Sequence, residues 1–138
     1  MGIDWASEYI GLPFKDRGRG PDGWDCWGFF QKLKQEQDGL EIPSYIDKYE
    51  TIQEKNRVSN AIIRGIEDEW VEVDEDNAKQ GDGVVFEIKG MVFHIGYILQ
   101  PPQFLHIHKN INSCLDRWTH GRWNRRIDGF YRHEDELS

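Results

Sequence analysis

The hydrophobic pattern of the chain changes near residue 81, and this change constrains the fold more than any other feature. Before it, residues 25–34 carry large apolar side chains at helical spacing, starting from Asp25. After it come four runs with strand-like composition and turn residues between them: 84–88, 91–99, 104–108 and 127–132. Helices followed by strands predict an α+β fold, with N-terminal helices packed on a C-terminal antiparallel sheet.

The remaining segments fit around this plan. Residues 4–10 predict a short helix, and residues 11–24 are rich in glycine and proline and predict a long loop. Gly39 is expected to end the helix that starts at Asp25. Residues 47–69 predict a second, exposed helix, and the acidic residues between 67 and 76 predict a solvated connection. The length of 138 residues is typical of one domain, spanning 1–138.

Charge and composition exclude several classes of protein. The formal net charge is −8, so nucleic acid is not expected as the main partner, because phosphate binding needs a basic surface. A late basic run including Arg132 is read either as a solvated strand and loop or as a binding patch. The Met1 start shows neither a signal peptide nor an apolar segment long enough for membrane insertion. We therefore expect cytoplasmic synthesis.

Cys26 is the first candidate for chemistry. It lies where the glycine-rich loop meets the predicted helix, and the free N–H groups and partial positive charge of a helix N-terminus favour a thiolate. The same N–H groups can stabilise an oxyanion. The competing interpretation is a buried cysteine that acts as a small hydrophobic residue. Cys114, the second cysteine, has no partner motif nearby and is interpreted as structural.

Histidines on two predicted strands support the catalytic interpretation. His94 lies within an apolar strand, and His106 follows it by 12 residues after a Pro-Pro turn, so a hairpin could set the two side by side. One imidazole could then act as the base while the other fixes its tautomer. His108 competes with His106 for the orienting role. A cysteine with two or three histidines could instead bind zinc, although the spacing lacks the pattern of structural zinc sites.

Three motifs together resemble the NlpC/P60 family of cell-wall cysteine peptidases. In chain order they are Gly-Leu-Pro-Phe at 11–14 with a glycine-rich loop and Asp-Cys-Trp-Gly at 25–28, Gly-Asp-Gly at 81–83 with His-Ile-Gly at 94–96, and Phe-Leu-His at 104–106. The resemblance implies a minimal papain-like fold with Cys26 as nucleophile, His94 as general base and His106 as its orienting partner. It also implies that no cofactor or metal is needed.

The resemblance further implies a substrate and a setting. The substrate would be an amide in a peptidoglycan stem peptide, usually the bond between γ-D-glutamate and a diamino acid. The form Asp-Cys-Trp-Gly in a short chain is most similar to phage tail assembly proteins of this family. The expected partners are therefore other phage tail proteins, and the expected place is a virion tail acting at the cell wall.

Four residues near Cys26 are candidates for substrate binding. Asp25 could cap the helix or hold a substrate amine, and Arg19 could grip a stem-peptide carboxylate or be solvated. Phe14 replaces the family's loop tyrosine and Trp27 its serine, so Trp27 either narrows the cleft or packs in the core. These departures keep two alternatives open: a structural tail protein that has lost catalysis, and an amidase or acyltransferase on other amides.

Overall fold

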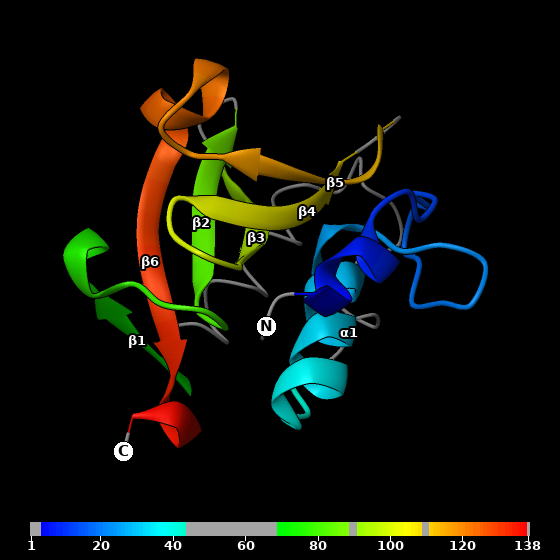
Figure 1. Ribbon diagram of the computed structural model, residues 1–138, viewed down its shortest axis with the longest axis horizontal. Helices are drawn as coiled ribbons and strands as arrows, with labels where there is room; N and C mark the ends of the chain where they lie inside the picture. The colour runs from blue at the N-terminus through cyan, green and yellow to red at the C-terminus, as the bar shows by residue number, and fades with distance from the viewer. Residues whose placement is uncertain (1–3, 44–68, 89–90, 109–110, 138) are drawn as a thin grey trace.

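The computed structural model describes residues 4–43, 69–88, 91–108 and 111–137. Within these ranges, the α-helix α1 (Cys26–Asp38) packs beside a six-stranded antiparallel sheet (Figure 1). The strands are β1 (Trp70–Val73), β2 (Gly83–Ile88), β3 (Met91–Ile98), β4 (Gln103–His108), β5 (Ile111–Arg117) and β6 (Ile127–His133). The short 3₁₀ helices are η1 (Asp4–Tyr9), η3 (Glu75–Asn77), η4 (Gly121–Arg126) and η5 (Glu134–Glu136). This architecture confirms the predicted α+β class.

Local sequence signals set both ends of α1. The Asp25 carboxylate accepts a hydrogen bond from the Gly28 N–H at 2.8 Å, which satisfies one of the free donors of the first turn. Gly39 ends the helix in the left-handed region at φ 66°, where a residue without Cβ is favoured. Phe29, Phe30 and Leu33 are almost completely buried. The predicted start, end and buried stripe of this helix are therefore confirmed.

Gly28 supports a close approach between α1 and the preceding loop. A Cβ added at this position would overlap the Gly18 carbonyl oxygen, which accepts hydrogen bonds from the Asp25 N–H and from the Arg19 guanidinium. We expect Gly28→Ala to destabilise the protein by about 1–3 kcal/mol, although alanine normally favours a helix. Chemical denaturation checks this, with Gln35→Ala on the exposed side of α1 as control. Equal stability of wild type and Gly28→Ala would show that the loop can move away without cost.

The sheet order is β1-β6-β2-β3-β4-β5. Strands β2, β3 and β4 form the predicted meander, and β5, which the sequence did not predict, extends it. The last strand, β6, returns across the sheet and pairs with both β1 and β2. The expectation of a solvated connection at 67–76 is wrong, because residues 70–73 pair with β6 and bury Trp70 while Glu72 faces solvent.

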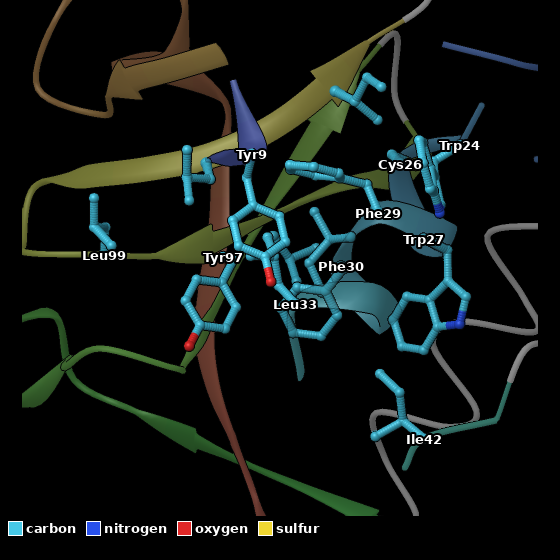
Figure 2. Packing of buried hydrophobic residues seen from close by; sticks show 14 of the residues in the cluster. Tyr9, Trp24, Cys26, Trp27, Phe29, Phe30, Leu33, Ile42, Tyr97 and Leu99 are labelled. Atoms are coloured by element: carbon cyan, nitrogen blue, oxygen red, sulfur yellow. The ribbon is translucent and has the colours of Figure 1, made fainter. Parts of the chain in front are cut away.

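Two apolar clusters fill the two faces of the sheet. Between α1 and the sheet, Phe29 and Leu33 of the helix pack in one cluster with Tyr97 of β3 (Figure 2). Ile95 of the same strand belongs to this cluster as well. On the opposite face, η4 contributes Trp123 to a second cluster. Adjacent residues of β3 therefore serve different clusters, as strand alternation requires.

Two further expectations concern other segments. The predicted helix at 47–69 lies almost wholly outside the described residues. Arg132, part of the basic run, donates from Nε and Nη2 to the two oxygens of Asp82 at 2.9 and 2.8 Å. Such a bidentate pair fixes β6 to the turn before β2, so this arginine is neither simply solvated nor part of a free basic patch.

Candidate active site

Cys26 is the first residue of α1, where the glycine-rich loop ends (Figure 2). The loop is held against the helix start by Arg19, whose Nη1 donates to the Asp25 carboxylate at 2.8 Å. Asp25 thus caps the helix and pairs with Arg19 at the same time. These contacts fix the position of the cysteine relative to the loop.

The Cys26 thiol is buried, with 4% of the residue exposed. Burial and, to a smaller extent, the nearby Asp25 carboxylate raise the pKa of this thiol to about 12, against the opposing influence of Arg19 and of the N–H groups of Ile95 and Trp27. The hydrogen bond from the Ile95 N–H places the sulfur against β3, and Cys26 and Ile95 belong to the same apolar cluster. At neutral pH the resting cysteine is therefore a thiol rather than a thiolate.

His94 and His106 lie together across β3 and β4, as the hairpin spacing predicted. His94 Nε2 and His106 Nδ1 are 2.8 Å apart, a hydrogen bond whose donor depends on the tautomers. His108 is also near His94, with ring centroids 5.3 Å apart and nearly perpendicular planes. Of the two competitors for the orienting role, His106 is the one joined to His94 by a described hydrogen bond.

Both paired histidines are kept neutral. Burial, with smaller contributions from His106 and His108, holds the pKa of His94 well below its ordinary value. Burial lowers the pKa of His106 to about 4, although the Asp116 carboxylate opposes this shift. A neutral imidazole can accept a proton at pH 7. His94 is therefore already in the form that a general base requires, and it becomes charged only when it takes a proton.

Three residues around the histidines were not predicted. Trp123 from η4 stacks on His94, with centroids 5.2 Å apart and an interplanar angle of 19°. Cys114 Sγ lies 3.6 Å from His106 Nε2, a partner that the sequence did not indicate for this cysteine. Asp116 Oδ2 lies 3.4 Å from the same nitrogen. The alternation of Cys114 and Asp116 would have indicated this cluster if β5 had been recognised.

The two unusual aromatic residues contribute to packing. Trp27 is 2% exposed, and its Nε1–H donates to the Pro43 carbonyl at 2.7 Å, so its ring lies in the core. Phe14 is half-buried against the same cluster and forms a β-bridge with Trp24.

Neither cysteine forms a disulfide. In the described part of the chain, no helix has the length and apolar character needed to cross a membrane.

The structure thus combines a helix that starts at a cysteine with a six-stranded antiparallel sheet that carries two hydrogen-bonded histidines. The chain belongs to the NlpC/P60 family, whose sequence profile matches residues 11–132. An NlpC/P60 protein from Bacillus cereus has the same fold, with a TM-score of 0.70 and 21% identity over 96% of this chain and 39% of its own.

Several relatives have names that describe a function. Murein DD-endopeptidase MepS/Murein LD-carboxypeptidase of Escherichia coli K12 is 23% identical over 126 residues, 91% of this chain. The match spans only 58% of the length of that relative. RipD from Mycobacterium tuberculosis, described as a non-catalytic NlpC/p60 domain protein adapted to peptidoglycan binding, is 17% identical over 94% of this chain and 92% of its own, with a TM-score of 0.57.

The raised pKa of Cys26 predicts slow alkylation at neutral pH. Because iodoacetamide reacts with the thiolate, the rate for Cys26 should rise about tenfold per pH unit from pH 7 to beyond pH 9. For a thiol with the ordinary pKa, the alkylation rate would stop rising near pH 9. Mass spectrometry of the Cys114→Ser variant isolates Cys26, and the unfolded protein in denaturant is the matched control. Rapid alkylation at pH 6 would contradict the thiol assignment.

Proposed function

We propose that the protein is a cysteine peptidase that hydrolyses amide bonds in peptidoglycan stem peptides. The observations that carry the proposal are the hydrogen-bonded pair of His94 and His106 and a cysteine at the start of α1 that lies against Ile95, the residue after His94. Membership of the NlpC/P60 family and the murein peptidase activities in the name of MepS support it. The bond between γ-D-glutamate and a diamino acid is the first candidate.

In this proposal Cys26 is the nucleophile and His94 its general base. His94 donates its Nε2–H to His106 Nδ1, which leaves His94 Nδ1 free to accept the thiol proton. Asp116 lies beside the other nitrogen of His106 and favours the tautomer with its proton on Nε2. The thiolate then attacks the amide carbonyl, His94 protonates the leaving amine, and water hydrolyses the thioester.

The neighbouring residues have supporting roles. The N–H groups at the start of α1 are oriented to stabilise the oxyanion of the tetrahedral intermediate. Asp25 and Arg19 neutralise each other in the resting protein, so substrate binding by either requires this pair to exchange partners. Phe14 offers apolar contact only, and Trp27 acts through packing.

Purified muropeptides test the function. Wild-type protein should release the products of stem-peptide hydrolysis, read by liquid chromatography and mass spectrometry, and Cys26→Ala should release none because the nucleophile is absent. Cys114→Ser is the matched control, since this cysteine has no part in the proposed mechanism. Full activity of Cys26→Ala would overturn the proposal. The set of muropeptides cleaved also decides between γ-D-glutamyl, DD- and LD-bonds.

A second candidate function is peptidoglycan binding without catalysis. The deep burial of Cys26 favours it, as does the fold shared with RipD. Sedimentation with insoluble peptidoglycan distinguishes the two: binding by wild type with no soluble product supports this candidate, and release of soluble peptides supports the peptidase.

The form Asp-Cys-Trp-Gly supports a setting in a phage or prophage tail, as a single domain spanning 1–138. Mass spectrometry of purified virions tests that setting.

A further inference from the structure

We propose that His106, Cys114 and Asp116 form a binding site for a divalent transition-metal ion of the zinc class. The three residues come from the β4–β5 hairpin, where His106 lies directly opposite Cys114 in the strand register. Asp116 is two residues beyond Cys114 on the same strand, so alternation places it on the same face. Strand pairing therefore brings a nitrogen, a sulfur and an oxygen donor together.

The separations of the donor atoms fit a tetrahedral ion. His106 Nε2 is 3.6 Å from Cys114 Sγ and 3.4 Å from Asp116 Oδ2, and all three donor atoms lie within 4.8 Å of one another. Two ligand atoms on a tetrahedral zinc ion at ordinary bond lengths lie about 3.3–3.6 Å apart. A small rotation of the Asp116 side chain, which is 39% exposed, closes the remaining separation.

The chemistry of the donors selects the class of metal. A thiolate and an imidazole suit zinc and related transition metals, whereas magnesium and calcium prefer oxygen ligands. Cys114 would bind as a thiolate and release its proton to solvent. Three protein ligands leave a fourth position for water, and the partial exposure of Cys114 and Asp116 gives the ion a path from solvent.

Hydrogen bonds from outside the cluster hold two of the ligands in place. The Trp123 Nε1–H donates to Asp116 Oδ2 at 2.9 Å, and His106 Nδ1 is hydrogen-bonded to His94. Metal-binding histidines commonly have their second ring nitrogen fixed in this way. His106 Nε2 is thereby directed toward the other two donors before any ion arrives.

Metal binding has a consequence for hydrolysis, and this step rests on the proposed function. A metal on His106 Nε2 keeps the proton of this ring on Nδ1, so that Nδ1–H donates to His94 Nε2. His94 must then carry its own proton on Nδ1, the nitrogen that the mechanism needs free. The ion therefore inhibits hydrolysis by reversing the His94–His106 hydrogen bond, without touching Cys26.

Cobalt titration of the purified chain tests the site without reference to activity. Wild type and Cys26→Ala should both develop a thiolate-to-cobalt charge-transfer band, which zinc displaces, while Cys114→Ser and Asp116→Asn should lose or weaken it. Absence of the band in wild type overturns the site. A band that persists in Cys114→Ser but disappears in Cys26→Ala places the metal on the other cysteine and also overturns it.

The effect on hydrolysis is measured separately on muropeptides. Zinc should inhibit wild type reversibly, with activity restored by a chelator, and Cys114→Ser should need at least tenfold more zinc for the same inhibition. Full hydrolysis by wild type at a zinc concentration that saturates the cobalt-defined site overturns the link to His94. If no hydrolysis occurs in metal-free buffer, the proposed function fails, while the cobalt titration still decides the metal site.

Discussion

Replacement of His94 by glutamine is expected to lower kcat/KM by about 10²–10⁴-fold, the usual contribution of a positioned acid–base group. The Cys26 thiol is held neutral by burial, so hydrolysis needs a base that takes its proton during the reaction. Glutamine retains a polar group able to contact His106 but cannot accept that proton. The measurement is steady-state hydrolysis of a muropeptide, with circular dichroism to verify that the variant is folded.

His106 provides the matched comparison for this prediction. Because His106 is a positioning residue, its replacement should lower kcat/KM less than the replacement of His94 does. His106→Asn should retain more activity than His106→Ala, since the asparagine carbonyl can still accept a hydrogen bond from the His94 Nε2–H. A merely structural role would not distinguish the two variants at equal stability. Equal activity of wild type and His94→Gln would show that another group removes the proton.

The low pKa of His94 also fixes the sign of the pH dependence. A protonated imidazole cannot act as a base, so activity is lost as the pH falls through the pKa of His94. Because burial holds this pKa well below 6.5, hydrolysis should stay constant as the pH falls from 7 through 6.5. A decline already centred at pH 6.5 would show that the site opens to solvent when substrate binds.

Trp123→Ala is expected to have the largest effect on stability, a loss of about 3–5 kcal/mol in the free energy of unfolding. The Trp123 ring is 4% exposed and packs between Phe86, 4.8 Å away by centroid, and His94. The substitution leaves a cavity and removes the indole N–H that donates a hydrogen bond to Asp116. Urea denaturation at pH 7 gives the free energy of unfolding.

Trp123→Phe separates packing from polar contact. Phenylalanine keeps an aromatic ring beside His94 but cannot donate to Asp116, so this variant should lose less stability than Trp123→Ala. Activity measured where both variants are folded then reports on the orientation of His94. A loss below about 1 kcal/mol for Trp123→Ala would contradict its place in the core, since that is the size expected for a surface substitution.

Part of the fold could be predicted because it depends on near neighbours in the sequence. Asp25, Gly39 and the apolar stripe of α1 are local signals, and the structure follows each of them. The hairpin length that joins His94 to His106 is also local, so their contact was predicted as well. Such features depend on backbone preferences and short loops, which act over a few residues.

The remainder depended on distant segments. The acidic residues around Glu72 gave no sign of a strand, because β1 exists through its pairing with β6, about sixty residues later in the chain. Lys34 is completely buried in α1 because Asp38 and Glu136 supply carboxylates to it, the second from the end of the chain. Sequence pattern alone would have placed such a lysine in solvent.

The sequence by itself determined the class of fold, the position of Cys26 at a helix start and the pairing of His94 with His106, because local signals set each of them. Only the tertiary structure decided that the Cys26 thiol is buried and that Cys114, Asp116 and Trp123 surround the histidines. The physical reason is that burial and the local electric field arise from all segments packed around a group. Those segments meet only when the sheet is complete.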